Sequence, residues 1–182
     1  MRILLINTSD RTGGAAVAAN RLLKALQKTG VSANMLVRDK ITQDTSVVSI
    51  NTSAAKKLIN RIRFVWERLV IFLCNHLSKE NLFQVSIANT GTDIRHYALV
   101  READVIHIHW INQGMLSLSD IKRLIDSGKP VVWTLHDMWP ATGVCHYAAL
   151  CDQYRSECTQ CPMMKHLFFW NLARTVYRHK ST

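Results

Sequence analysis

The chain has 182 residues, of which 48% are hydrophobic and 20% are charged, and its formal net charge is +10. This length is enough for one domain with a full core, and this composition excludes an intrinsically disordered chain. The positive charge favours anionic partners such as nucleic acid, anionic lipid or phosphate-bearing metabolites, without choosing among them.

No targeting segment is visible in the sequence. The start, MRILLINTSD, has only four consecutive apolar residues before Asn7, too few for the core of a signal peptide. No window reaches the roughly eighteen apolar residues of a membrane-spanning helix. We therefore expect a cytoplasmic protein, with peripheral contact at the inner face of a membrane as an option, in which cysteines stay reduced.

The N-terminal part has the pattern of a β-loop-α-β unit, from which parallel sheets are built. RILLIN predicts a strand at residues 2–7, and residues 31–39 and 46–50 predict two more. Between them, apolar residues recur at the helical spacings of three and four: Ala15, Ala18, Ala19, Leu22, Leu23 and Leu26. Gly30 is placed to cap the C-terminus of that helix.

A long helix is predicted at residues 53–77. Its apolar stripe consists of Leu58, Ile62, Val65, Leu69 and Phe72, broadened by Ile59, Trp66, Val70, Leu73 and Leu77. Its basic residues are Lys56, Lys57, Arg61, Arg63 and Arg68. Such a helix lies either on an anionic membrane or, more commonly, over the sheet with its charged face in water, and we favour the second arrangement. No aromatic-basic signature of nucleic-acid binding accompanies Trp66, so we expect no nucleic-acid partner.

The second half of the chain continues the alternation. Residues 83–87 predict a short strand, residues 92–103 a short helix with Thr92 as its N-cap, and residues 103–110 a further strand.

A helix is predicted at 117–128, because Ser117 and Asp120 form a capping-box pattern and Gly128 ends it. The continuous apolar run at 131–136 predicts a strand covered on both faces. Residues 163–180 predict a basic terminal helix.

These alternating elements predict an α/β protein with a Rossmann-like, doubly wound parallel sheet. Ligands of such sheets bind outside the carboxyl ends of the strands. Three polar features fall on that edge: Gly13–Gly14, His109–Trp110 and His136–Asp137. They lie far apart in sequence, and the topology brings them to one rim.

The Gly13–Gly14 pair opens a helix, where free N–H groups and the helix dipole suit a phosphate. The alternative is that the two glycines only allow a tight turn from strand to helix. His136 is placed to hydrogen-bond a sugar hydroxyl or move a proton, unless it caps a neighbouring loop. His109, at a strand end, is a better site candidate than His107, which we interpret as a satisfied core histidine.

Four cysteines follow the pattern C-x5-C-x6-C-x2-C, namely Cys145, Cys151, Cys158 and Cys161. Four converging thiolates suit a structural zinc, although the second CxxC of a strong zinc-ribbon pattern is missing. Reduced, packed thiols are an equal alternative, and disulfides are a third. Residues 145–161 are therefore predicted to be a cysteine-rich loop.

Three segments resemble the N-terminal half of family-4 glycosyltransferases, particularly the bacterial surface-polysaccharide type: TGGAAVAANRLLKAL, ADVIHIHWIN and GKPVVWTLHDMWPATGVCHY. The resemblance covers residues 1–25 and 103–162. It implies the GT-B fold, in which two Rossmann-like domains face each other across a cleft. The N-terminal domain mainly holds the acceptor, and the C-terminal domain binds the nucleotide-sugar. Transfer proceeds with retention at the anomeric carbon and without a metal in the chemistry.

Carried over by motif, Gly13 and Gly14 match the glycine loop near the donor diphosphate, and His136 matches the strand-tip histidine that contacts the transferred sugar. We therefore predict His136 as the catalytic residue. The predicted substrate-binding residues are Gly13, Gly14, His109, Trp110 and Asp137, and no cofactor is expected for catalysis.

The family's second half is absent from residues 1–182, and no two glutamates of this chain have the spacing of the family's paired donor-site glutamates. We expect a domain that is inactive without a nucleotide-sugar half. The chain is then either a truncated product or fragment, or one subunit of an enzyme whose second half is a separate chain. Two functions from different classes remain, with a nucleotide-binding regulator as a weaker third. The first is the acceptor-side half of an enzyme that transfers a sugar to a glycan or lipid-linked acceptor. The second is a binding or assembly module without turnover.

Overall fold

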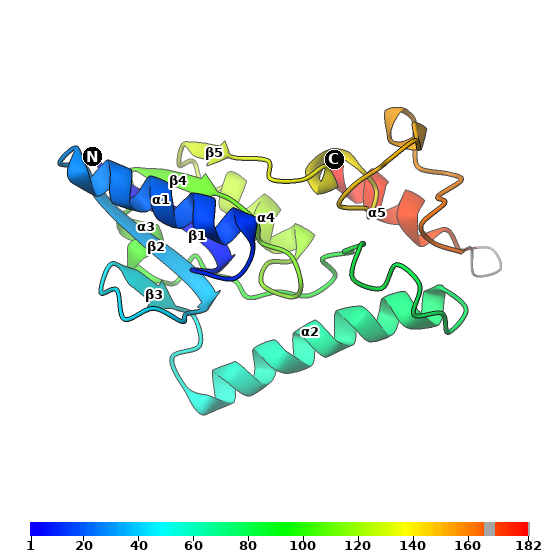
Figure 1. Ribbon diagram of the computed structural model, residues 1–182, viewed down its shortest axis with the longest axis horizontal. Coiled ribbons are helices and arrows are strands. Elements are labelled where there is room, and N and C mark those ends of the chain that lie inside the picture. Colours follow the sequence, from blue (N-terminus) through cyan, green and yellow to red (C-terminus); the bar gives the residue numbers. More distant parts are fainter. Residues whose placement is uncertain (166–169, 182) are drawn as a thin grey trace.

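The structure is a computed structural model that describes residues 1–165 and 170–181 (Figure 1). Its centre is a five-stranded sheet in the order β3-β2-β1-β4-β5, and every neighbouring pair is parallel. The strands are β1 (Arg2–Ser9), β2 (Ser32–Asp39), β3 (Val47–Ser49), β4 (Val105–Ile108) and β5 (Val131–Trp133). The predicted α/β, doubly wound parallel fold is confirmed.

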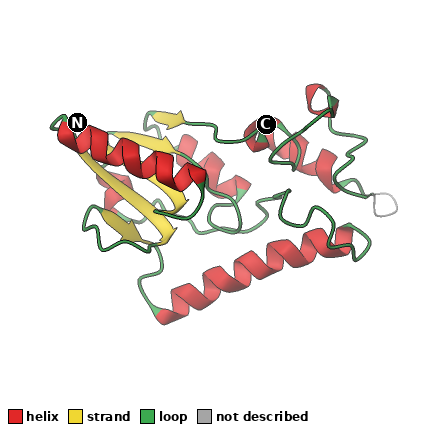
Figure 2. Ribbon diagram, in the orientation of Figure 1, coloured by secondary structure: helices red, strands yellow, loops and turns green. Residues whose placement is uncertain are grey.

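Helices α1 (Gly14–Lys28), α3 (Ala98–Glu102) and α4 (Leu118–Ile125) cover the two faces of this sheet (Figure 2). The other helices are α2 (Ala54–Cys74) and α5 (Leu172–Lys180), with 3-10 turns η1 (Trp139–Ala141) and η2 (Gln153–Arg155). Because side chains alternate along a strand, Leu5 packs with Leu23 of α1, whereas Leu4 and Ile6 belong to the core that holds Val100 of α3 and Leu124 of α4. In the described part of the chain, no helix is long and apolar enough to cross a membrane.

The residues that cap the ends of the helices are mostly as predicted. Ser117 and Asp120 form the complete capping box of α4, and Gly30 lies just beyond α1 with φ +82°, where only glycine is unstrained. The helix predicted from Thr92 instead begins at Ala98, after Tyr97, because the Thr92 hydroxyl donates to Asn60.

Two predicted strands were wrong in type or extent. Residues 83–87 form no strand, and only Val85 makes an isolated bridge, to Cys145. The strand predicted at 131–136 ends at Trp133 and is not covered on both faces, since Val132 is 49% exposed. In the described sheet β5 is an edge strand whose one neighbour is β4, so an apolar run did not mean full burial.

The terminal helix predicted at 163–180 is shorter. Helix α5 occupies Leu172–Lys180, residues 163 and 164 are turn and bend, and residues 166–169 lie outside the described residues. Lys180, the last residue of α5, donates to the carbonyl oxygens of Trp139, Thr142 and Gly143 at 2.6, 3.0 and 3.0 Å. The end of α5 is thereby attached to the loop that follows β5.

Helix α2 does not cover the sheet with its apolar stripe, so the arrangement that we favoured from the sequence is wrong. Its buried residues include Asn60, Glu67 and Arg68, together with Ile71 and Cys74. The opposite side carries seven large hydrophobic side chains that are 41–59% exposed, and we name it the apolar face of α2: Leu58, Ile59, Ile62, Val65, Trp66, Leu69 and Leu73. The physical reason is a set of buried polar contacts on the inner side.

Glu67 has no exposed surface, and its Oε1 accepts from the backbone N–H groups of Ile87 and Ala88, both at 2.9 Å. Its Oε2 lies 3.1 Å from Nη2 of Arg68, which also donates through Nη1 to the Val85 carbonyl at 2.9 Å. These bonds cannot be made if α2 turns its apolar face inward, so they determine which side of the helix points to solvent.

Candidate functional site

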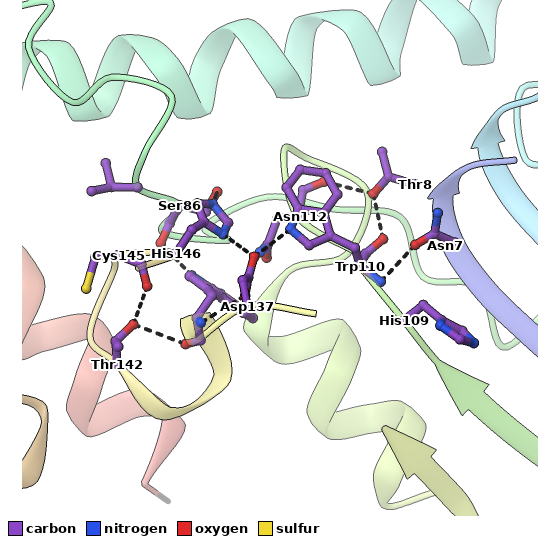
Figure 3. A network of polar contacts seen from close by, with 12 residues as sticks. Asn7, Thr8, Ser86, His109, Trp110, Asn112, Asp137, Thr142, Cys145 and His146 are labelled. Atoms are coloured by element: carbon purple, nitrogen blue, oxygen red, sulfur yellow. Dashed lines mark hydrogen bonds and ion pairs between the residues drawn. The ribbon is translucent and has the colours of Figure 1, made fainter. Parts of the chain in front are cut away.

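The candidate site lies at the carboxyl ends of β1 and β4, where the strand order reverses. Chains leave β1 and β4 in opposite directions there, which opens a crevice beyond the strand ends. The Asn7 side-chain oxygen accepts from Trp110 N at 2.8 Å, and Thr8 donates through its N and Oγ1 to the Trp110 carbonyl at 2.7 and 3.0 Å. These bonds join the two strand ends and hold the crevice in shape (Figure 3).

A cavity of about 530 Å³ opens at this point. Its lining comes from segments distant in sequence: Asn7, Thr8, Ser9, Thr12, Gly13, Gly14, Ala15, Arg38, Asp39, Trp110, Gln113, His136 and Asp137. Gly13, Gly14, Trp110, His136 and Asp137 were all predicted from the sequence as site residues, and the fold brings them together. This volume is in the range of small-molecule sites.

The start of α1 forms one wall of the cavity. Gly13 is the N-cap with φ +89°, no side chain caps this helix, and no acidic residue occupies its first turn. A Cβ at Gly13 or Gly14 would meet nothing within 4 Å, so the space above both residues is open. The positive end of the helix dipole therefore faces a cavity that leaves room for an anionic group.

The opposite side carries a charged pair that sequence reasoning missed. The guanidinium of Arg38 is paired with Asp39, Nη2 to Oδ2 at 2.6 Å, and also donates to the Gln113 carbonyl. Arg38 is therefore held at a defined position on the wall of the cavity. Its place at the end of β2 was the available signal, since strand ends on this edge supply ligand contacts.

Asp137 is the centre of a hydrogen-bond network (Figure 3). Its Oδ2 accepts from Trp110 Nε1 at 2.8 Å and from His146 Nδ1 at 2.7 Å, and its Oδ1 accepts from Trp139 N at 2.9 Å. Burial alone raises the pKa of Asp137, but the bonds from His146, Trp139 and Trp110 outweigh it, and the pKa lies below its ordinary value. The carboxylate orients the indole of Trp110 at the cavity wall.

Ser86, His146 and Asp137 are hydrogen-bonded in the sequence found in Ser-His-Asp nucleophile sites. Ser86 Oγ lies 3.0 Å from His146 Nε2, and His146 Nδ1 lies 2.7 Å from Asp137 Oδ2. Ser86, however, has no exposed surface, and Arg68 donates toward its Oγ at 3.4 Å. No substrate reaches this hydroxyl. The arrangement instead fixes the His146 ring so that its Nδ1–H points at Asp137.

Three histidines form a stack between β4 and the loop after β5. The rings of His107 and His109 lie 4.4 Å apart, and those of His109 and His136 lie 5.1 Å apart. His109 Nδ1 and His136 Nε2 are hydrogen-bonded at 2.8 Å, and His107 Nε2 is bonded to Thr134 Oγ1 at 2.8 Å. His136 lines the cavity, whereas His109 is 3% exposed and lies behind it.

The burial of His109 determines which atom of His136 is available to a ligand. His109 Nε2 is buried without a hydrogen-bond partner. An unpaired N–H at this position would destabilise the fold more than an unpaired lone pair. We therefore assign the proton of His109 to Nδ1, which donates to His136 Nε2. The Nδ1–H of His136 is then the group left to donate toward the cavity.

We expect the protein to lose stability through His109 as the pH falls from about 6.5 to about 4. Burial, followed by the nearby His107 and His136, lowers the pKa of His109 to about 4. Between these pH values the unfolded chain binds a proton that the folded chain does not, so acid favours unfolding by about 2–3 kcal/mol. Urea unfolding at pH 7 and pH 4.5 measures this loss.

In His109→Leu the loss between these two pH values should be smaller, because the titrating group is gone. His96→Leu, which changes an exposed histidine, is the matched control and should keep the full loss. An equal loss in His109→Leu and the parent chain would contradict the assignment.

The clustered cysteines lie in a second core, formed by the C-terminal part of α2, the loop after η1 and α5. Cys145 and Cys158 are buried there, Cys151 and Cys161 are half-buried, and all four are free. Burial raises the pKa of Cys145 and Cys158, and raises that of Cys161 to about 11. Across the described residues no three or more His, Cys, Asp or Glu side chains are arranged to hold a metal ion. This geometry fits packed thiols, and a structural zinc stays a prediction.

Comparison with known proteins gives one partial match. No protein-family model and no solved structure matches the chain. A curated protein named putative colanic acid biosynthesis glycosyl transferase WcaC, from Escherichia coli strain K12, is 33% identical over 66 residues. That stretch covers 33% of this chain and 16% of the relative. The chain is therefore similar to a glycosyltransferase over a minor part of that protein's length.

Proposed function

We propose that the chain is the acceptor-side domain of a glycosyltransferase, corresponding to the N-terminal half of a GT-B enzyme. In this proposal the enzyme transfers a sugar from a nucleotide-sugar to a glycan or lipid-linked acceptor, with retention at the anomeric carbon. The nucleotide-sugar half lies outside residues 1–182 or in another chain, and the protein works in the cytoplasm.

One observation carries the proposal. A single cavity at the topological switch point is lined by the glycine-started helix α1 and by His136. The two features suit the two parts of a nucleotide-sugar, a diphosphate and a sugar. The 33% identity with the Escherichia coli glycosyl transferase over 66 residues supports the same chemistry.

The cavity residues have separate roles in this proposal. The N–H groups at the start of α1, near Gly13 and Gly14, stabilise the phosphate that leaves with the nucleotide. His136 donates its Nδ1–H to a hydroxyl of the transferred sugar. Trp110 presents a fixed aromatic surface to a sugar ring, because Asp137 holds its indole N–H. None of these steps uses a metal.

An alternative is a binding or assembly module that keeps the cavity without turnover. The carboxylates that line the cavity support this alternative, because both are engaged by other protein groups. Asp39 is paired with Arg38, and Asp137 accepts hydrogen bonds from three protein donors. Neither is free to act as a base. A sugar transferase that works by positioning and electrostatics does not require one, so this observation does not displace the first proposal.

The test is a transfer assay with the purified chain. It is incubated with several nucleotide-sugars and lipid-linked acceptors, with and without the C-terminal part of the Escherichia coli relative, and nucleotide release and product are measured. We expect no multiple turnover by the chain alone and transfer when the second part is present. Multiple turnover by the chain alone would contradict the half-enzyme, and binding without transfer in every combination would favour the binding module.

A further inference from the structure

We propose that a groove between α2 and the end of β2 binds a phosphate group, which makes the acceptor of the transfer a phosphate-bearing molecule. The statement about the acceptor rests on the proposed function, whereas the phosphate site does not. The groove has a volume of about 210 Å³. It is lined by Arg38, Asp39, Asn51, Lys57, Asn60, Arg61 and Phe64. Figure 1 shows the first turns of α2 on the β2–β3 side of the sheet.

The α2 residues of this groove come from one side of the helix. They follow one another at the helical spacing of three and four, which places their side chains together: Lys57, Asn60, Arg61 and Phe64. Asn60 is 4% exposed, so this side of α2 is turned toward the sheet and away from the apolar face. Lys57 and Arg61 are exposed and form the rim of the groove. A ligand that enters the groove therefore meets both cations.

Hydrogen bonds hold the two walls of the groove together. Asn60 Nδ2 donates to Asn51 Oδ1 at 2.7 Å, and Asn51 Nδ2 donates to the Arg38 carbonyl oxygen at 3.0 Å. The guanidinium carbon of Arg38 lies 6.0 Å from the centre of the Phe64 ring. Helix α2 is thereby attached to the end of β2, and the groove has its shape before a ligand arrives. A site that is ordered in advance binds with a smaller loss of entropy.

The cations of the groove are not neutralised within the described part of the chain. The one carboxylate among the lining residues is Asp39, and it is paired with Arg38. The side chains of Lys57 and Arg61 make no hydrogen bond or ion pair to any described residue. Like charges four residues apart destabilise a helix, and cations in the first turn oppose its dipole, where α2 has no acidic residue. An anion between the two side chains removes this repulsion.

A phosphate matches these cations better than a carboxylate does. A phosphate monoester carries about 1.5 to 2 negative charges at pH 7 on three terminal oxygens, whereas a carboxylate carries one charge on two oxygens. Three cations line the groove from two elements, Arg38 from β2 and Lys57 and Arg61 from α2. Guanidinium and ammonium groups both bind phosphate oxygens through charge-assisted hydrogen bonds. The groove is also smaller than the sites of drug-sized ligands, so it suits one charged group.

Arg38 connects the groove to the candidate cavity, because it lines both. It donates its Nε–H and one Nη2–H to Asp39 and one Nη1–H to the Gln113 carbonyl oxygen. Two of its five N–H groups are then without an acceptor in the described chain and can bind a ligand. An acceptor whose phosphate lies in the groove has its adjoining atoms at the cavity, where the transferred sugar is proposed to lie.

The first experiment measures binding to the purified 182-residue chain by isothermal titration calorimetry. The probes are glucose 1-phosphate, inorganic phosphate and glucuronate, which carries a carboxylate on a similar sugar. We expect glucose 1-phosphate to bind most tightly, with an affinity that falls as salt is raised. The double variant Lys57→Gln/Arg61→Gln should bind it at least about tenfold more weakly, because two charge-assisted bonds are lost.

The matched control is Arg21→Gln/Lys28→Gln on α1, which removes the same charge at exposed positions outside the groove. It should bind glucose 1-phosphate as the parent chain does, and both double variants should keep the circular dichroism and melting temperature of the parent. The second experiment is the transfer assay with both parts of the enzyme. There Lys57→Gln/Arg61→Gln should raise the KM of a phosphate-bearing acceptor about tenfold, and the control should not.

Three calorimetric results would overturn the phosphate site. The first is no binding of either phosphate by the parent chain. The second is equal binding by Lys57→Gln/Arg61→Gln and the parent, which would place the phosphate at the start of α1 instead. The third is glucuronate binding as tight as that of glucose 1-phosphate, which would make the groove a carboxylate site.

The two experiments separate this inference from the proposed function. If calorimetry shows the loss of binding in Lys57→Gln/Arg61→Gln but no combination gives transfer, the phosphate site stands and the proposed enzyme fails. If transfer occurs with the same KM in this variant and the parent, the enzyme stands and the acceptor inference fails. Tighter binding of inorganic phosphate than of glucose 1-phosphate would likewise overturn the acceptor inference, because the groove would then serve free phosphate.

Discussion

Replacing Glu67 with alanine should lower the free energy of unfolding by about 3–5 kcal/mol. The change leaves the N–H groups of Ile87 and Ala88 without their acceptor and leaves Arg68, which is 6% exposed, without its counter-ion. A buried charge without a partner is among the largest single-residue penalties in a folded protein. Urea denaturation followed by circular dichroism gives the value.

Two further variants test whether the loss of stability comes from the buried Glu67–Arg68 pair or from any substitution of a glutamate in this region. Glu67→Gln keeps an acceptor oxygen for the two N–H groups and loses the charge, so it should cost less than alanine. Glu80→Ala, at an exposed glutamate just beyond α2, should stay within about 0.5 kcal/mol of the parent chain. If Glu67→Ala proved as mild as Glu80→Ala, the buried pair would not be what holds α2 in place.

The second large effect concerns His136. In the transfer assay with both parts of the enzyme present, His136→Ala should lose about 2–4 kcal/mol of transition-state stabilisation, or about 30- to 1,000-fold in kcat/KM. The reason is that, in the proposed function, His136 donates its Nδ1–H to the transferred sugar, and alanine removes this donor. The variant also leaves His109 Nδ1 without a partner, so a folding cost of about 1 kcal/mol should accompany it.

His107→Ala is the matched control for this experiment. His107 stacks on the other side of His109 and bonds to Thr134, but it does not line the cavity. We expect it to alter stability slightly and kcat/KM little. Comparable kcat/KM in the two variants, or a large fall in the Tm of His136→Ala with unchanged activity, would make His136 a structural residue.

The rim of the site was predictable because it depends on topology. Gly13–Gly14, Trp110 and His136–Asp137 follow strands of one parallel sheet, and the carboxyl ends of such strands meet at one edge. The network behind the rim was not predictable. Ser86 and His146 come from segments without regular structure, and their bonds to each other and to Asp137 depend on how those loops pack.

The sequence by itself determined the features that arise from local order along the chain. The alternation of strand and helix patterns determined the α/β class, and local signals such as the Ser117–Asp120 capping box and Gly30 determined where helices start or end. These depend on residues a few positions apart, whose geometry is set by the backbone itself.

Only the tertiary structure decided which apolar surfaces are buried. The stripe of α2 has the spacing of a core-facing helix, yet Glu67 and Arg68 find partners in residues 82–88 and turn that stripe to solvent. Residues 131–136 have the composition of a central strand, yet β5 is the edge of the described sheet. Hydrophobic periodicity shows that a face is apolar, whereas burial depends on which distant segment packs against that face.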